Sequence, residues 1–329
     1  MTLDDIFKVT SLTDAIAKIP VPPGLIGSWG LFEQKGVRTT SVLIEVRNGR
    51  LFLVPDSPRS SDPEAVSHSK RAAFPLRAAH LAASDVILPE DIQDIRGFGQ
   101  EGTDSGLKSQ ATEINDRLEA LKVSLEATLE YHRIGAVRGV VLDADGSVLV
   151  NLFDAFGVTK QALTIPFSSA STNVLQLVLQ AKRLAEKKLG GVAYSGFRAV
   201  VGSDFFDALV GHKGVKEAYA NWQAAQDRLG GDLRRGFVFA GVEFIEIPDV
   251  VGDTAFLPAE VGQLVPIGRG IFKQYFAPAN YNEAVNTIGQ PWYAKSEPRK
   301  LGKGYDIEAQ TNPLTICTYP EALVELTAS

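Results

Sequence analysis

The chain has 329 residues, of which 45% are hydrophobic and 22% are charged, a composition typical of a folded protein with one large core or two smaller ones. Acidic residues outnumber basic ones by 39 to 33, and the formal net charge of -6 leaves no positive surplus to neutralise nucleic-acid phosphates. Composition therefore argues against sequence-independent DNA binding by the whole chain.

Cysteine and histidine usage excludes several further classes. The single cysteine, Cys317, has no partner within the chain, which excludes an internal disulfide framework and favours folding in a reducing compartment. The N-terminus carries acids where a secretory signal needs basic residues, and no apolar run approaches the roughly 18 residues of a membrane span. The four histidines are scattered, and none has zinc-ligand spacing to another histidine or to the cysteine. We expect no cofactor, no metal and no membrane contact.

The sequence of residues 1–36 predicts an N-terminal arm that lies against other parts of the protein or a neighbour and is not a packed domain of its own. One short amphipathic stretch runs from Leu3 to Ile19, and Pro20, Pro22 and Pro23 then stop any helix.

Residues 37–98 predict an extended excursion that contains a two-stranded ribbon. Two β-branched runs in Val37–Val54 flank Asn48-Gly49, a pair whose positions both tolerate the positive φ of a tight hairpin turn. An isolated ribbon is marginal in water and leaves unpaired edges, so we expect it to contact a neighbouring chain. Arg38, Arg47 and Arg50 alternate on its outer face, where they can reach acids of a neighbour.

A long helix is predicted from a cap at Thr103 or Ser105 to about Arg133. Apolar residues at alternating four- and three-residue steps form one stripe, and we expect the charged residues to occupy the other faces. The stripe is Leu107, Ala111, Ile114, Leu118, Leu121 and Leu125, and the charged set is Glu113, Asp116, Arg117, Glu119, Lys122, Glu126 and Glu130.

The middle of the chain predicts a hairpin followed by a compact α+β module over residues 169–269. The hairpin is expected over Arg138–Val150, with its turn in Asp143–Gly146. In the module, Asn173 with Gln176 resembles a capping box and begins a helix that Gly190 and Gly191 end. The other expected elements are a strand at Phe197–Val201, a helix capped by Ser203 or Asp204, a helix at Val215–Leu229 and a strand segment at Phe237–Ile247 interrupted at Gly241.

The last 60 residues return to strand-like pieces at Gly304–Thr311 and Leu314–Tyr319.

Gly97, Gly99 and Gly102 match the spacing of a dinucleotide-binding loop and precede a helix. The match lacks its context, because no apolar strand runs into Gly97 and no acid-ending strand follows about 20 residues later. A flexible hinge before the long helix is the better interpretation, and a dinucleotide-dependent enzyme is kept as a remote alternative.

The remaining candidate residues also have simpler structural explanations. Ser203, Asp204 and His212 are close in sequence, but the Gly-x-Ser-x-Gly elbow of a hydrolase is absent, so Ser203 is interpreted as a helix cap. Asp143 and Asp145 fit a hairpin turn, since the further ligands of a calcium loop are missing. Cys317 in a C-terminal strand is interpreted as a small apolar core thiol. The sequence therefore predicts no catalytic constellation.

The order of parts resembles the α+β fold of tailed-phage major capsid proteins that is named after phage Hong Kong ninety-seven. More specifically, the chain resembles the phage major capsid protein E family, which includes the lambda-type coat protein, over nearly its full length. The residues that carry the resemblance are Ile19-Pro20, Gly30-Leu31-Phe32, Thr39-Thr40, Asn48-Gly49-Arg50, Phe205-Phe206-Asp207, His212, Ala277-Pro278-Ala279, Val285-Asn286-Thr287-Ile288-Gly289, Tyr293-Ala294-Lys295 and Gln310-Thr311-Asn312-Pro313-Leu314.

The resemblance implies four parts. They are an N-terminal arm (residues 1–36), an extension loop (37–98), a peripheral domain with the spine helix (99–168 with 270–329) and an axial domain (169–269).

The resemblance also implies a structural protein that forms hexamers and pentamers of an icosahedral shell in the virion, assembled in the host cytoplasm. A separate scaffolding protein, a portal and a decoration protein are expected partners, and packaged DNA is expected to meet the inner wall only through non-specific contacts. An encapsulin-like cellular compartment shell is the alternative with the same fold. The candidate intersubunit residues are Arg38, Arg47, Asn48, Gly49 and Arg50.

Overall fold

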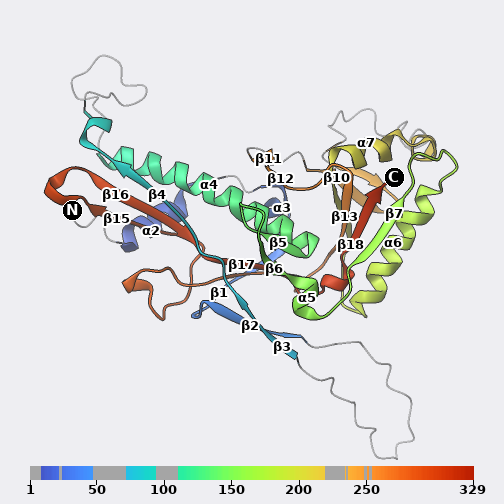
Figure 1. The fold of residues 1–329 in the computed structure, drawn as a ribbon, viewed down its shortest axis with the longest axis horizontal. Helices are drawn as coiled ribbons and strands as arrows, with labels where there is room; N and C mark the ends of the chain where they lie inside the picture. The colour runs from blue at the N-terminus through green and yellow to red at the C-terminus, as the bar shows by residue number, and fades with distance from the viewer. Residues whose placement is uncertain are drawn as a thin grey trace, which may run out of the picture.

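The computed structural model has three visible parts. A long helix lies along narrow sheets, a compact α+β module adjoins one end of it, and a two-stranded ribbon extends away from the body (Figure 1). The structure describes residues 9–21, 24–46, 72–93, 110–218, 234, 236–247, 250–251 and 254–329.

The spine helix α4 spans Gln110–Arg138, and its 29 residues give a length of about 43 Å at about 1.5 Å per residue. It continues past the predicted end at Arg133, and the expected cap residues lie outside the described residues. The predicted apolar stripe is confirmed where it is described, since Ile114, Leu118 and Leu125 are buried. Not all of the charged residues on the other faces are exposed, because the helix also buries Glu113, Lys122 and Glu130. The N-terminal segment covers the face that carries Lys122 and Glu130.

The N-terminal segment forms two helices and a strand along the body. Helix α2 (Val9–Lys18) lies within the predicted amphipathic stretch, and α3 (Leu25–Ser28) follows the prolines. Strand β1 (Phe32–Gly36) pairs in parallel with β14 (Phe272–Phe276).

Two three-stranded sheets support the spine helix. The sheet of order β1-β14-β17 is completed by the antiparallel β17 (Pro313–Cys317). The second sheet has the order β15-β16-β4, and its strands are β4 (Leu81–Ile87), β15 (Tyr293–Pro298) and β16 (Tyr305–Thr311). Leu12 and Ile16 of α2 pack with Leu118 and Ile307 into the core between this second sheet and the helices.

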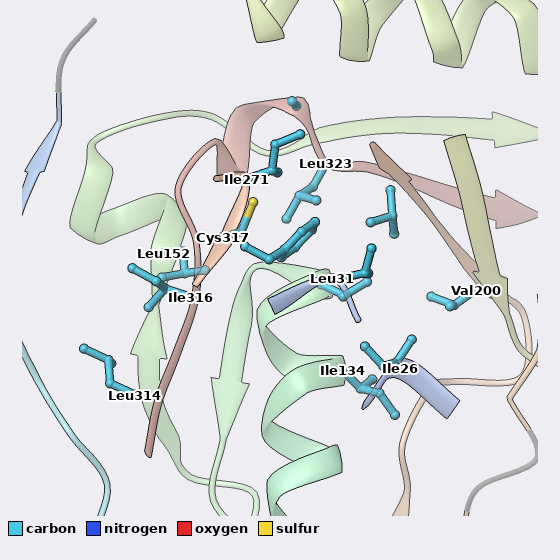
Figure 2. Packing of buried hydrophobic residues seen from close by; sticks show 14 of the residues in the cluster. Ile26, Leu31, Ile134, Leu152, Val200, Ile271, Leu314, Ile316, Cys317 and Leu323 are labelled. Atoms are coloured by element: carbon cyan, nitrogen blue, oxygen red, sulfur yellow. The ribbon is translucent and has the colours of Figure 1, made fainter. Parts of the chain in front are cut away.

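The main core lies where the N-terminal segment, the C-terminal half of α4 and β17 meet. Leu31, Ile134 and Cys317 converge there (Figure 2), together with Phe272 and Leu323. The core therefore joins parts of the chain that are nearly 300 residues apart.

The compact module is built on a mixed six-stranded sheet of order β7-β18-β13-β8-β10-β9. Its strands are β7 (Gln161–Ile165), β8 (Gly196–Val201), β9 (Phe237–Phe239), β10 (Val242–Glu246), β13 (Val261–Ile267) and β18 (Val324–Ala328). Strands β7 and β18 come from outside residues 169–269, so the sheet extends beyond that segment on both sides.

Helices α6 (Val174–Leu189) and α7 (Ser203–Gly211) pack their buried faces against this sheet and form one hydrophobic core with it. The start of α6 is confirmed: the Asn173 side chain accepts a hydrogen bond from the Gln176 backbone N–H at 3.0 Å. Its end is confirmed at Gly190, whose φ of 60° lies in the left-handed region. The predicted helix Val215–Leu229 is described only as far as residue 218.

The cap expected for α7 is wrong by one residue. The N-cap is Gly202, and no side chain makes a cap hydrogen bond there. A Cβ on Gly202 would lie 2.4 Å from the carbonyl oxygen of Pro258, so the close approach of another backbone requires glycine.

The described part of the ribbon consists of two strands. Strand β2 (Ser41–Val46) pairs antiparallel with β3 (Ala72–Arg77), while the predicted turn at Asn48-Gly49 and the run that follows it lie outside the described residues. Backbone hydrogen bonds from Ala78 to Thr40 and from Ala79 to Pro313 hold β3 at the ribbon's base, just before it continues into β4. Contacts at the base thus hold β3 in place beside β2.

The second predicted hairpin is confirmed. Strands β5 (Val140–Leu142) and β6 (Val148–Asn151) pair across a turn in which the Gly146 N–H donates to the Asp143 carbonyl at 2.9 Å. The remaining described elements are α5 (Leu152–Phe156), β11 (Val250–Val251), β12 (Thr254–Ala255) and short 3-10 helices at Pro89–Asp91, Asn282–Ala284, Lys300–Gly302 and Pro320–Ala322.

Candidate intersubunit surfaces

The histidine nearest to a hydrolase-like arrangement has a structural role. His212 Nδ1 accepts from the Gly214 backbone N–H at 3.2 Å, and His212 Nε2 lies 3.1 Å from the Ser169 carbonyl oxygen, to which it donates. Ser203 Oγ contacts Asp204 at 3.3 Å. Because backbone groups occupy both ring nitrogens, His212 is not available as a base for Ser203.

The other chemical candidates have equally limited reactivity or lie outside the described residues. Cys317 is fully buried, and burial raises the pKa of its thiol to about 12. A thiol in that state is a poor nucleophile at neutral pH, so the core interpretation is confirmed. Gly97, Gly99 and Gly102 lie outside the described residues. Within the described ranges, no group of three or more His, Cys, Asp or Glu side chains could hold a metal ion. None of the described helices is long and apolar enough to cross a membrane.

The ribbon exposes an apolar side chain on a sheet of only two described strands. Ile44 and Leu76 on one face are buried in the main core at its base, while Leu43 on the opposite face is exposed. Arg38, between β1 and β2, is also exposed. Arg47, Asn48, Gly49 and Arg50 lie outside the described residues. A two-stranded sheet with an outward-facing leucine fits a surface that a neighbour covers.

A second apolar surface lies on the loop between β14 and β15. Val285 and Ile288 are 63% and 57% exposed, although other side chains of the same loop are buried. Tyr281, Ala284 and Tyr293 form a small buried cluster beneath it with Ala279. The Gly289 N–H donates to the Val37 carbonyl at 2.8 Å, which attaches the loop to the base of the ribbon. We call Val285 and Ile288 the loop patch.

A third exposed site is the tip of the β15–β16 hairpin. Leu301 is 89% exposed and has a φ of 64°, a left-handed conformation that leucine rarely adopts. Arg299, Lys300 and Lys303 surround it. Val285 and Ile288 are among the residues that carry the family resemblance, but the exposure of the loop patch and of this tip was not predicted from the sequence, because isolated apolar residues in glycine- and proline-rich loops carry no periodic signal.

The fold is that of tailed-phage capsid proteins. The capsid protein of Myoviridae phage XM1 matches with a TM-score of 0.52 at 10% sequence identity, covering 100% of this chain and 99% of that one. This likeness shows the fold alone.

The sequence comparisons define the family. Residues 8–328 match the family described as Phage major capsid protein E, and the chain belongs to that family. The major capsid protein of Salmonella phage Felix O1 (isolate Felix O1-VT1) is 24% identical over an alignment of 359 positions including gaps, which covers 98% of this chain and 96% of that protein. The major capsid protein of Pseudomonas phage KPP10 is 28% identical over an alignment of 355 positions including gaps, which covers 98% of this chain and 97% of that protein. The chain is therefore a structural capsid protein and not an enzyme.

Proposed function

We propose that many copies of this chain close, as hexamers and pentamers, into the icosahedral head of a tailed double-stranded DNA phage. The observation that carries the proposal is the family match over residues 8–328, nearly the whole chain. A shell closes when one surface of each subunit contacts a different surface of its neighbour. The ribbon, the loop patch and the β15–β16 tip supply three separate surfaces of that kind.

The parts of the subunit receive the following roles in this proposal. Residues 1–36 are the arm, 37–98 the extension loop, 99–168 with 270–329 the peripheral domain and 169–269 the axial domain around the five- and six-fold positions. Strands β7 and β18 are added to the axial domain, since they share its sheet.

The extension loop is the proposed clamp between subunits. Its ribbon offers Leu43 for burial, and Arg38, Arg47 and Arg50 for salt bridges to acids of the neighbour, with Asn48 and Gly49 between Arg47 and Arg50 in the sequence as further contact residues. Contacts of mixed apolar and charged character give both affinity and a defined register.

Other partners follow from the same role. We expect a separate scaffolding protein, a portal and a decoration protein, and assembly in the host cytoplasm. The net charge of -6 leaves packaged DNA with only non-specific contacts to the inner wall.

Shortening the ribbon tests the proposal. Deletion within residues 47–53, which keeps Ile44 in the main core, should leave the isolated subunit folded by circular dichroism and abolish shells in electron micrographs, because the lost contacts belong to the neighbour. The matched control shortens the β5–β6 turn by removing Ala144 and Asp145, and it should still form shells. Loss of folding in the ribbon deletion would instead place the ribbon in the subunit's own core, and shells from that deletion would contradict a clamp.

A further inference from the structure

The spine helix buries charged side chains beneath the N-terminal segment. Lys122, Glu130 and Arg133 are only 5%, 3% and 5% exposed. Removing a charge from water is costly, and a well-packed apolar side chain of similar size is often as stabilising or more so. Burial of these groups therefore calls for specific partners, which the backbone of the N-terminal segment provides for Lys122 and Glu130, and α4 itself for Arg133.

Lys122 binds the C-terminal end of α2. Its Nζ donates to the carbonyl oxygens of Ile16 and Ile19, both at 2.7 Å, and lies 3.4 Å from that of Ala17. Carbonyls at the end of a helix lack intrahelical partners and carry partial negative charge, which suits an ammonium group. The ring of Trp292 lies 5.4 Å from the same nitrogen and adds a cation–π contact.

Glu130 binds the start of α3. Its carboxylate accepts hydrogen bonds from the backbone N–H groups of Ile26 and Gly27, the latter at 3.1 Å. Arg133 Nη1 donates to Glu130 at 3.1 Å and to Glu126 at 2.6 Å, which balances the buried carboxylate. A Cβ on Gly24 would lie 2.4 Å from Glu130 Cδ, so glycine at this position lets the chain approach the carboxylate.

The two contacts have opposite polarity and lie eight residues apart on α4, about 12 Å along the helix at 1.5 Å per residue. The positive group binds acceptors where α2 ends, and the negative group binds donors where α3 begins. Apolar packing by Leu12 and Ile16 is non-directional, so it does not by itself fix where along α4 the segment lies. Paired contacts to backbone groups do fix that position.

We propose that Lys122 and Glu130 are positioning residues that fix the N-terminal segment on the spine helix in the register that shell assembly requires. This inference rests on the proposed shell-forming function.

Hydrogen exchange and assembly together test the proposal, with Glu130→Ala and Lys122→Met as the variants. In Glu130→Ala, the amides of Ile26 and Gly27 should exchange at least ten-fold faster, while amides of the six-stranded sheet keep their rates. Lys122→Met retains the apolar stem and removes the donor, and it should speed exchange in residues 16–21. Both variants should give few or no regular shells. Glu119→Ala on the exposed side of α4 is the control and should match the parent protein.

The conservative variant Glu130→Gln separates positioning from general stability. Its single amide oxygen still accepts from Ile26, so exchange and shell yield should lie between those of the parent and Glu130→Ala. Should Glu130→Ala fail to fold, Glu130→Gln and Lys122→Met decide the question. Unchanged exchange in both would overturn the inference.

Faster exchange with normal shell yield would also overturn the positioning role, while leaving the shell-forming function intact. A parent protein that forms no shells under conditions where it is folded and its scaffolding partner is present would count against the proposed function, whatever the exchange rates show.

Discussion

His132 gives the subunit a pH-dependent stability whose sign and size follow from its position. The side chain lies in α4, is 1% exposed, and its Nε2 has no hydrogen-bond partner among the described residues. Burial lowers the pKa of His132 from 6.5 to about 4, against a smaller opposing effect of Asp143. Between those values the unfolded chain binds a proton at this position that the folded chain excludes.

Because the folded pKa lies below the unfolded one, the free energy of unfolding should fall as pH falls from 6.5 and level off below pH 4. Each pKa unit corresponds to about 1.4 kcal/mol, so His132 should contribute a loss of about 3 kcal/mol over this interval. Above pH 6.5 the residue is neutral in both states and contributes no slope.

The assay is urea unfolding of the unassembled subunit at several pH values, for the parent and for His132→Leu. Leucine has a similar volume and does not titrate, so the difference between the two proteins cancels the contributions of all other groups. The parent should lose about 3 kcal/mol more than the variant between pH 7 and pH 4. Parallel pH profiles would refute the reasoning, since they would mean that His132 is protonated in the folded state.

Three further predictions concern packing, assembly and reactivity. Leu118→Ala should lower the free energy of unfolding by about 3 kcal/mol in urea titration, because Leu118 is fully buried. The control Val123→Ala, on the exposed side of α4, should change this free energy by less than about 0.5 kcal/mol. Equal effects of the two substitutions would contradict the assigned faces of α4. Val285→Asp with Ile288→Asp should keep the parent melting temperature and abolish shells in micrographs, and intact shells would remove the loop patch from the interfaces. Cys317 should resist a thiol reagent in the native subunit and react on unfolding; rapid native labelling would place the thiol at the surface.

Elements marked by local chemistry could be predicted from the sequence. The cap at Asn173, the left-handed Gly190 and the turn at Asp143–Gly146 each require particular residues at fixed offsets. Such signals act over a few residues and do not depend on contacts with distant parts of the chain. The family resemblance rested on the order of the larger parts along the chain and on the short motifs within them.

Features set by distant contacts could not be predicted in this way. The partner of β2 is β3, and its place depends on backbone contacts at the ribbon's base that no local turn signal encodes. Lys122 and Glu130 have the sequence pattern of solvent-facing residues, and only the path of the N-terminal segment over α4 buries them. The exposure of Val285 and Ile288 in the loop patch is likewise determined by the tertiary fold of the subunit. These are the features through which the subunit organises its arm and meets its neighbours.

The measurement that tests the account most directly is electron microscopy of the purified protein at high concentration with a scaffolding partner present. Closed shells of uniform diameter are the predicted result, with the ribbon of each subunit lying on a neighbour at subnanometre resolution. Monomers alone, with the ribbon folded back on its own body, would contradict the claim that the exposed apolar surfaces are completed by sister copies.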